Sequence, residues 1–468
     1  MATSILDFPP ELLSYLLSFT GGLDLSNVCQ SCRKMRESSR VESIWQRRCK
    51  EEYGVSVSAK DLQPFTFYQL YTKLLYKYGS ILGLWKPLLG PYGGITHVKL
   101  NKDRLEIWLI TTSADKEITS PLRQQLLYSI AINLGGPEQV LCHQGHKGTH
   151  QCTFLIQGND KGAYQAGEGE NEKVPDECGD AQNNTADDTN DDSDNYSDES
   201  ENELDNYDWN EIQGKKWSDD TKVKFRVICK RSHDHPNGIH AEYLAWYKEE
   251  TGKAHASGEQ GFEAWFVNLQ YGFDEHLLRT KFDIIRTLNT SLKFSRLHLP
   301  TNQNGKIIQP GLFKGTYGAH GIEIVKLDYD VDKNEANAIK ITGDPNVPAG
   351  EWTLNIDLSR PMQLTLAQQK RLADLQDIDI PDISPQIPPQ EIPPQPFKIP
   401  AGCMERAKDV PSSCIARFHG HGQIAGHAFD NPSTTPGHWI VFNEDSFGFI
   451  WMELRSFSIY SRVKETFS

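Results

Sequence analysis

Apolar residues recur at helical spacing between positions 6 and 53, and this pattern predicts three short helices. Pro9 and Pro10 suit a first helical turn, where no backbone N–H is needed, and the glycine pair at 21–22 ends that helix. Asp24 can cap a second helix, and Ser43 precedes a third. The apolar residues of the first helix are Leu12, Leu13, Leu16, Leu17 and Phe19. A unit of about 45 residues cannot bury them all, so we expect an apolar surface that binds a partner.

The period changes from helical to alternating after an amphipathic helix predicted over 65–78. Eleven short segments separated by Gly and Pro turns then predict strands. They are 104–112, 128–134, 153–157, 222–229, 295–299, 322–329, 338–342, 352–358, 415–419, 438–443 and 448–454. One long helix is predicted over 262–287. This composition favours a closed or nearly closed antiparallel barrel, with the helix covering one opening or edge.

The predicted fold class is therefore α+β. A three-helix unit (1–55) and a linking helix (56–80) precede an antiparallel, barrel-like β domain (81–380) that carries a disordered acidic insertion (166–216). A spacer at 381–400 contains eight prolines and should be extended, which favours a bridge over a ligand for SH3 or WW domains. Strands within 401–468 then complete the β domain.

The net charge of −15 is concentrated in one segment. Residues 166–208 hold seventeen Asp and Glu against one Lys, so removing their charge of −16 leaves the rest of the chain near +1. With almost no aliphatic residues, this segment cannot bury enough surface to offset its chain entropy. We expect a solvated loop rather than a docking tail for a basic protein. No basic face interleaved with aromatic residues indicates nucleic-acid binding.

Nine scattered cysteines do not have the dense spacing of a disulfide framework, so free thiols or metal ligands are expected. No apolar run approaches the ~18 residues that cross a bilayer, and the N-terminal residues lack the pattern of a secretory signal. We therefore expect no membrane partner and an intracellular protein, chiefly cytoplasmic, with the nucleus or centrosome as further locations.

The helical unit closely resembles the F-box, the motif by which substrate receptors bind the Skp adaptor of SCF (Skp–cullin–F-box) ubiquitin ligases. The features that carry the resemblance are Pro9, Glu11, Leu12-Leu13, Asp24-Leu25, Val28-Cys29, Arg33 and the run from Trp45 to Cys49. The resemblance implies an adaptor surface made by Pro9, Leu12, Leu13, Leu16, Leu17, Val28 and Trp45. The alternative is a small helical hairpin packed on the rest of the protein.

Longer blocks in both halves of the chain resemble the F-box only protein 31 family. They are 82–94 (LGLWKPLLGPYGG), 145–150 (GHKGTH), 308–325 (IQPGLFKGTYGAHGIEIV), 340–350 (KITGDPNVPAG), 422–429 (GQIAGHAF) and 445–463 (DSFGFIWMELRSFSIYSRV). The resemblance implies a β-barrel that receives substrates through C-terminal tails, including those of D-type cyclins and tails that end in an amide. The F-box begins at residue 6, so no role of a longer N-terminal extension is carried over.

Two groups of possible zinc ligands flank the acidic insertion. Five lie within 142–152, namely Cys142, His143, His146, His150 and Cys152, and a second group contains Cys229, His233 and His235. Two ligands from each side could form a tetrahedral site that fastens the base of the loop, although buried thiols and surface histidines would explain the same residues. The family resemblance implies Cys142, His150, Cys229 and His235. Four protein ligands leave no open position, which indicates structural zinc.

Two glycine-punctuated segments, 314–321 and 340–346, are candidate recognition elements. Glycine lets a ligand approach the backbone closely, and the neighbouring polar side chains can form fixed hydrogen bonds, although both segments would equally suit tight turns. Asp344 could accept from a terminal amide and would repel a carboxylate. The candidate substrate residues are Tyr317, Lys340, Thr342, Asp344 and Asn346.

These patterns predict a non-catalytic substrate receptor of a ubiquitin ligase. The sequence contains no HExxH, GxSxG or GxxxxGK[ST] motif that would position a nucleophile, a metal-bound water or a phosphate. A zinc-dependent hydrolase with an accessory F-box remains the alternative from another class. A glycan-binding F-box receptor is a third hypothesis, since the chain has a β-rich body and ten tryptophans.

Overall fold

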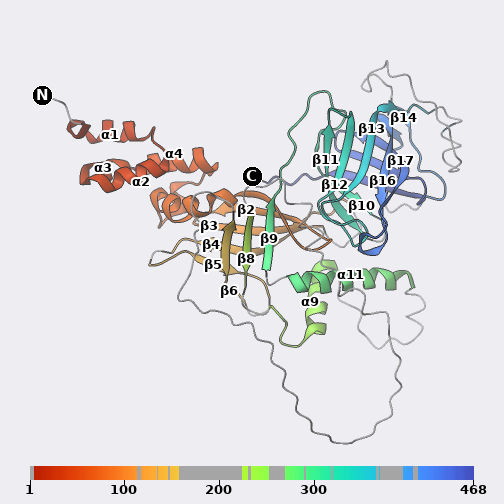
Figure 1. The fold of residues 1–468 in the computed structure, drawn as a ribbon, viewed down its shortest axis with the longest axis horizontal. Coiled ribbons are helices and arrows are strands. Elements are labelled where there is room, and N and C mark those ends of the chain that lie inside the picture. Colours follow the sequence, from red (N-terminus) through yellow and green to blue (C-terminus); the bar gives the residue numbers. More distant parts are fainter. Residues whose placement is uncertain are drawn as a thin grey trace, which may run out of the picture.

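The computed structural model describes residues 5–112, 118–133, 135–145, 148–157, 224–229, 233–251, 269–288, 291–317, 320–364, 368, 394–403 and 409–467. The predicted acidic insertion, the first 13 residues of the proline-rich spacer and the start of the predicted long helix lie outside these residues. Figure 1 shows the N-terminal helices at one end, a sheet in the middle and a barrel at the other end. No helix in the described part is both long and apolar enough to cross a membrane.

The N-terminal unit consists of a short 3-10 turn and four helices, one more than predicted. They are η1 (Ile5–Asp7), α1 (Pro10–Leu17), α2 (Gly22–Ser31), α3 (Arg33–Ser39) and α4 (Glu42–Tyr53). The helix that the apolar pattern missed, α3, is polar along most of its length, and the Cys32 thiol at its N-cap accepts from the Met35 N–H over 3.5 Å. Gly54 ends α4 in the left-handed conformation, with φ at 71°.

A chain of short helical segments joins this unit to the β-rich body. It comprises α5 (Ala59–Leu62), α6 (Phe67–Gln69), the π-helical η2 (Leu70–Leu75), α7 (Tyr76–Tyr78) and η3 (Gly79–Ile81). The Tyr71 hydroxyl donates to Glu52 Oε2 over 2.5 Å, and the Gly22 N–H donates to Glu52 Oε1 over 3.1 Å. Helices α2, α4 and η2 are therefore fastened together, and the linker continues the core of the helical unit into the body.

The first half of the body is a nine-stranded antiparallel sheet in the order β6-β5-β4-β3-β2-β1-β9-β8-β7. Its strands are β1 (Gly83–Pro87), β2 (Ile95–Asn101), β3 (Arg104–Thr111), β4 (Arg123–Ala131), β5 (Gln139–Cys142), β6 (His150–Gln151), β7 (Thr153–Gln157), β8 (Lys224–Ile228) and β9 (Ser291–Arg296). Two helices, α9 (Ile239–Thr251) and α11 (Leu269–Leu288), lie between β8 and β9 in sequence. Residues 269–287 of the predicted long helix are thus present within α11, which Figure 1 places beside α9 below the sheet.

The second half is a closed barrel of eight antiparallel strands. Its strands are β10 (Gly311–Thr316), β11 (Ile322–Asp330), β12 (Glu335–Lys340), β13 (Trp352–Pro361), β16 (Ala416–Ile424), β17 (Ser433–Asn443), β18 (Ser446–Trp451) and β19 (Ser456–Arg462). A two-stranded ribbon, β14 (Gln395–Pro396) with β15 (Ser413–Cys414), accompanies it. Aromatic and aliphatic side chains from all eight strands fill the barrel. Eight strands leave an interior that side chains can fill, whereas a barrel of all the strands would be too wide.

The predicted fold class is confirmed, with helices at the N-terminus followed by antiparallel, barrel-like sheets. The expectation of one β unit is corrected, since the strands divide between an open sheet and a closed barrel. A separate apolar cluster, which includes Ile95 and Ile110 of the sheet with Ile324 and Ile341 from the barrel side, joins the two bodies. Residues beyond the spacer supply half of the barrel, so segments more than 90 positions apart, such as Phe313 and Tyr460, become neighbours in one core.

Candidate functional site

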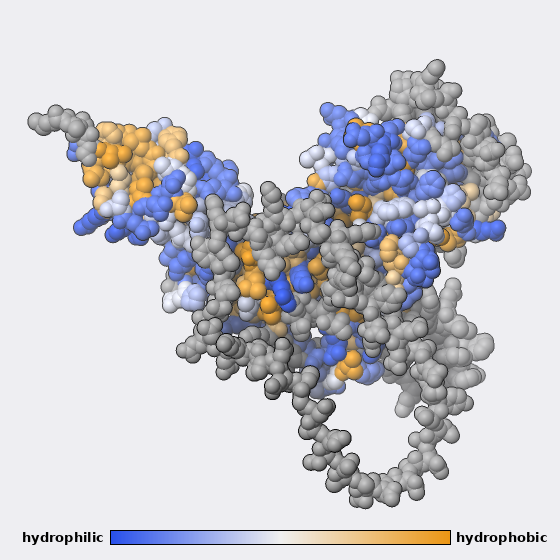
Figure 2. Space-filling model, in the orientation of Figure 1, coloured by the Kyte–Doolittle hydropathy of each residue, from blue (hydrophilic) through white to orange (hydrophobic). Residues whose placement is uncertain are grey.

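An exposed apolar surface covers the N-terminal helices. Figure 2 shows it as an orange area over this end of the molecule. Leu12 and Leu16 of α1 are each 41% exposed, and Phe19 is 61% exposed. The other exposed large apolar side chains of the unit are Ile5, Leu6, Tyr15, Leu23 and Val41. So many neighbouring apolar side chains in water are typical of a protein-binding surface.

Three of the predicted adaptor residues are part of the core of the helical unit. Leu13, Leu17 and Trp45 are buried, and the Trp45 indole N–H donates to the Ser39 carbonyl over 2.7 Å. They belong to one buried cluster that also contains Leu25 of α2, Met35 of α3 and Ile44 of α4. A one-dimensional leucine pattern does not specify which side of α1 faces that cluster. Pro9 and Val28 retain exposed surface, as Leu12 and Leu16 do.

Four buried side chains form a compact group of metal-ligand type. Cys142 ends β5, His150 begins β6, Cys229 follows β8, and His233 lies four residues further on, with one donor atom from each lying within 4.8 Å of the others. His150 Nε2 is 2.8 Å from Cys229 Sγ, and His233 Nε2 is 3.5 Å from Cys142 Sγ. Two thiols and two imidazoles in this arrangement are the donor set of a structural zinc site.

The group lies between residues from the two ends of the nine-stranded sheet. Cys142 and His150 come from strands β5 and β6 at one end of the strand order, while Cys229 follows β8 beside the other end. His150 Nδ1 is 2.9 Å from the Gly148 carbonyl, which leaves Nε2 directed into the group. A bound ion would therefore tie together two sheet ends that have no ladder of hydrogen bonds between them among the described strands.

His235, which the family resemblance implied as the fourth ligand, does not belong to this group. Its Nδ1 accepts from the Asn237 N–H over 3.1 Å, which commits the ring to a local turn, and His233 takes its place. Of the other competitors, His143 Nε2 pairs with Ser129 Oγ at 2.8 Å, and Cys152 is not one of the four. His146 lies outside the described residues.

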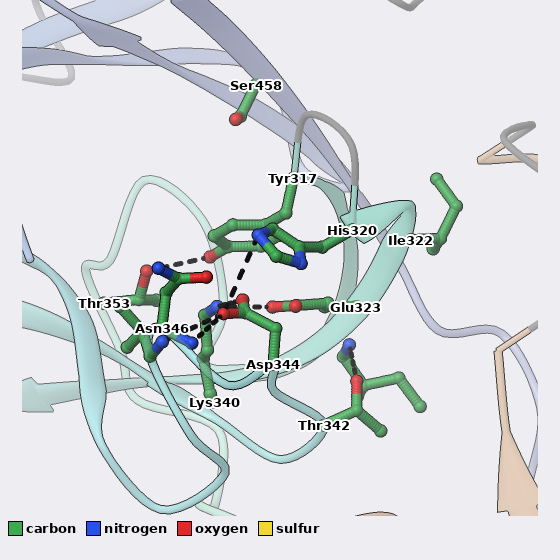
Figure 3. A network of polar contacts seen from close by, with 12 residues as sticks. Tyr317, His320, Ile322, Glu323, Lys340, Thr342, Asp344, Asn346, Thr353 and Ser458 are labelled. Atoms are coloured by element: carbon green, nitrogen blue, oxygen red, sulfur yellow. Dashed lines mark hydrogen bonds and ion pairs between the residues drawn. The ribbon is translucent and has the colours of Figure 1, made fainter. Parts of the chain in front are cut away.

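The five predicted substrate residues come together at one end of the barrel. Lys340, the last residue of β12, donates to Asp344 Oδ2 over 2.6 Å, and its ammonium lies over the Tyr317 ring at 4.3 Å from the centroid. Asp344 Oδ1 accepts from the backbone N–H groups of Asn346 and Val347 at 2.7 and 3.0 Å. Figure 3 shows these polar groups pointing toward one another. The predicted turn geometry is thus present, and the same turn presents a buried carboxylate.

The Asp344 carboxylate is held in its ionised form. Burial alone would raise its pKa, but the Lys340 ammonium and the surrounding hydrogen bonds outweigh burial and hold the pKa well below its usual range. Oδ2 accepts from Lys340 and Oδ1 from two backbone N–H groups, and the Glu323 side chain hydrogen-bonds to the same carboxylate.

A cavity of about 240 Å³ opens beside this network. Its walls come from the nine-stranded sheet, from α9 and α11, and from the barrel rim, where His320, Glu323, Thr342 and Asp344 line it. Tyr317, Lys340 and Asn346 do not line it. The Lys340 ammonium lies over the Tyr317 ring and pairs with the carboxylates. The Asn346 side chain donates to the Ala425 carbonyl over 3.1 Å. Two of the five predicted residues therefore face the cavity.

Comparison with known proteins decides the family. The chain is 31% identical to F-box only protein 31 of Rattus norvegicus over 512 aligned residues, which span 99% of this chain and 85% of the relative. It is also 31% identical to F-box only protein 31-B of Xenopus laevis and 30% identical to F-box only protein 31 of Homo sapiens, each over 99% of this chain and 84% of the relative. The chain belongs to the F-box only protein 31 family. It is thus an F-box substrate receptor, and the exposed apolar helices are its F-box.

A second comparison concerns the barrel. Residues 294–466 match the family model described as Cyclin D1 binding domain. This range contains the whole barrel together with Lys340, Asp344 and the rim of the cavity. In this chain the matched domain is therefore the part of the fold that holds the buried polar network.

Sequence reasoning missed Glu323. It is the second residue of β11, is 3% exposed, and has its Oε2 2.7 Å from Lys340 Nζ. A glutamate in an alternating strand sequence is normally expected to face solvent. Glu323 does not, because it lies at the start of β11, where the part of the protein that contains the nine-stranded sheet covers the barrel. The only available signal was its position directly after the glycine-punctuated segment 314–321.

Proposed function

We propose that this chain is the substrate-recognition subunit of an SCF ubiquitin ligase, which binds the C-terminal tails of target proteins for ubiquitination and proteasomal degradation. The observation that carries the proposal is the presence of two sites on one chain. An exposed apolar F-box surface lies at one end, and a cavity with a buried, ionised carboxylate lies at the barrel. The Tyr71–Glu52 hydrogen bond fastens the linker to helix α4, between these two sites in the chain.

The F-box surface binds the Skp adaptor of the cullin complex in this proposal. Leu12, Leu16 and Phe19 would leave water on binding, and each large apolar side chain that is fully buried contributes about 1.5–3 kcal/mol. The buried Leu13, Leu17 and Trp45 act indirectly, because they set the angles between the four helices.

The cavity receives the end of a substrate tail. A terminal amide brings N–H donors that Asp344 can accept, whereas a terminal carboxylate brings only acceptors and a like charge. We therefore propose that tails ending in an amide are preferred over free acids. The match of residues 294–466 to a Cyclin D1 binding domain supports D-type cyclin tails as a second class of target.

The zinc site has a structural role in this account. Cys142, His150, Cys229 and His233 are four protein donors with no further position needed for a water molecule, which distinguishes them from the ligands of a zinc hydrolase. In this proposal no acid, base or nucleophile is required from the chain. Tethering raises the effective concentration of target lysines near the charged conjugating enzyme.

Reconstituted ubiquitination tests this function. The chain, bound to Skp and the cullin complex, is given a reporter protein fused to an amidated tail, and the control is the same reporter without the tail. Ubiquitin chains should form on the intact reporter alone. Equal modification of both reporters would rule out tail recognition, and no binding to Skp would rule out the ligase role.

A further inference from the structure

Helices α9 and α11 form one wall of the tail cavity. The side chains that they place at the cavity include Trp246 and Glu250 of α9 and Leu277, Leu278, Lys281 and Ile285 of α11. Neither helix takes part in the hydrogen-bond ladders of the sheet or the barrel, so contacts between side chains determine where this wall lies. Figure 1 shows the two helices as a separate layer below the sheet.

One end of this wall is fastened to the sheet by a buried carboxylate. Glu250, near the end of α9, is 5% exposed and accepts from Lys281 Nζ of α11 over 2.6 Å and from the Arg123 guanidinium of β4. Burial alone would raise the pKa of Glu250, but the two cations outweigh burial and hold the pKa below its usual range. The ionised carboxylate therefore connects α9, α11 and the sheet at this end.

The other end of the wall is fastened to the metal group. Arg286, in the last turn of α11, donates from Nη2 to Asp234 Oδ1 over 2.7 Å and from Nε to Glu242 Oε2 over 3.2 Å. Asp234 directly follows His233, one of the four candidate metal donors, and Glu242 lies in the first turn of α9. A single guanidinium thus joins both helices to the segment that carries a metal donor. Ile285, the residue before Arg286, lines the cavity.

The segment that joins the metal group to α9 has little regular structure to hold it in place. Residues 233–238 form neither a helix nor a strand. His233 Nε2 lies 3.5 Å from Cys142 Sγ, a contact between a thiol and an imidazole that is weak on its own. Bonds from all four donors to one zinc ion would replace this contact and hold His233 on the sheet. Asp234, at the adjacent position, would be held with it.

We propose that Arg286 is a positioning residue of the tail cavity, which transmits zinc binding at the four-donor group to the α9–α11 wall through Asp234. Zinc and a tail then bind cooperatively, although no donor of the metal group lines the cavity. This inference rests on the proposed function and deepens it, because it names a condition for tail binding. Coupling between two sites is reciprocal, so the factor by which zinc increases tail affinity equals the factor by which a tail increases zinc affinity.

The experiment uses the Skp-bound full chain, with zinc removed by chelation and restored by titration. A fluorescent peptide that ends in a primary amide reports the affinity of the cavity, and hydrogen–deuterium exchange of residues 277–286 reports the wall itself. Arg286→Gln and Asp234→Asn remove the proposed connection, and neither residue is a metal donor or lines the cavity. Lys333→Gln is the control, because it breaks an ion pair with Asp330 in a turn of the barrel outside the cavity.

Removal of zinc from wild type should weaken peptide binding about 5- to 10-fold, the lower end of the range for coupled sites, since the Arg286–Asp234 pair is partly exposed. Amide exchange in 277–286 should become faster at the same time. Arg286→Gln should keep its zinc, bind the peptide as weakly as zinc-free wild type and respond little to chelation. Asp234→Asn should do the same, and the double variant should bind no more weakly than either. Lys333→Gln should behave like wild type.

The inference is overturned if zinc-free wild type keeps both its peptide affinity and its slow exchange in α11, or if Arg286→Gln retains the full zinc dependence of peptide binding. If the zinc-free chain unfolds, the zinc-bound variants decide, and normal peptide affinity in Arg286→Gln contradicts the proposal.

Failure of the proposed function has a different result, in which zinc-bound wild type does not bind the peptide. The exchange measurement then decides by itself. Faster exchange on zinc removal in wild type but not in Arg286→Gln would still support the connection, and an equal change in both would contradict it.

Discussion

Lys340 donates to Asp344 over 2.6 Å at a point where both side chains are almost completely buried. The two residues are four positions apart, at the end of β12 and in the turn that follows, so the contact is set by local chain geometry. The turn presents the carboxylate to the cavity, and the ammonium keeps it ionised. Asp344 is thus both a member of a buried ion pair and the recognition group that we propose.

Asp344→Asn should reduce the preference for amidated over free-acid tails at least tenfold. The substitution removes the charge that repels a terminal carboxylate, and it replaces one acceptor oxygen by an NH₂ group. Competition binding with the peptide pair measures the ratio of the two affinities. Stability should also fall by about 1–3 kcal/mol, because backbone donors that Asp344 satisfies lose a charged acceptor. An unchanged affinity ratio in a folded variant would remove Asp344 from the site.

Leu16→Glu should abolish purification of the chain with the Skp adaptor while leaving its thermal unfolding unchanged. Leu16 lies in the exposed apolar surface, so the charge costs little in the free protein but would be buried in the complex. Lys60→Glu introduces a glutamate at an exposed position of α5 and serves as the matched control. Leu13→Glu should unfold the helical unit instead, since Leu13 is 1% exposed. Adaptor binding by folded Leu16→Glu would contradict the assignment of this surface.

His233→Ala should remove bound zinc, and His235→Ala should retain it. The two histidines are two positions apart, but only His233 directs a ring nitrogen into the group with Cys142, His150 and Cys229. Inductively coupled plasma mass spectrometry of the purified chain gives the metal content, with about one zinc per wild-type chain expected. Chelation should lower the melting temperature of wild type and leave that of His233→Ala unchanged. Loss of zinc in His235→Ala alone would reverse the assignment.

His438 should make the protein less stable in mild acid. Burial, together with the nearby Arg417 and His419, lowers the pKa of His438 to about 3, whereas in the unfolded chain it titrates near 6.5. The unfolded chain therefore binds the proton first, and stability present above pH 6.5 is lost as the pH falls toward 3. Between pH 7 and 5.5 the loss due to His438 is about 1 kcal/mol.

Urea unfolding at these two pH values measures that loss. In His438→Gln the difference between pH 7 and 5.5 should shrink by about the same amount, since the glutamine does not titrate. His421→Gln, at an exposed position of the adjacent strand β16, is the control. If the stability of His438→Gln depends on pH in the same way as that of wild type, His438 does not cause the predicted loss of stability in acid.

Local patterns predicted much of the fold. Alternation located strands such as 153–157, and the excess of leucines between 12 and 17 predicted an apolar surface. Neither pattern contains information on partners distant in sequence, so the division into a sheet and a barrel and the inward direction of Leu13 and Leu17 were missed. Glycine-rich β10 and aromatic-rich β19 were also not identified as strands, because their packing in the closed barrel compensates for weak or irregular alternation.

The candidate sites show the same limit. The Cys and His spacing located both halves of the metal group, but the choice of His233 over His235 depends on a turn that only the folded chain defines. The residues of the 340–346 turn were predicted because they are local in sequence. Glu323 was not, since its burial results from the docking of the first β body against the barrel rim.

Binding of one peptide with two different ends tests the central claim most directly. The Skp-bound chain is titrated with a fluorescent tail peptide synthesised as the primary amide and as the free acid, with the sequence and label unchanged. The account predicts that the amide binds at least tenfold more tightly than the acid. Equal affinity for the two peptides, or a preference for the acid, would contradict it.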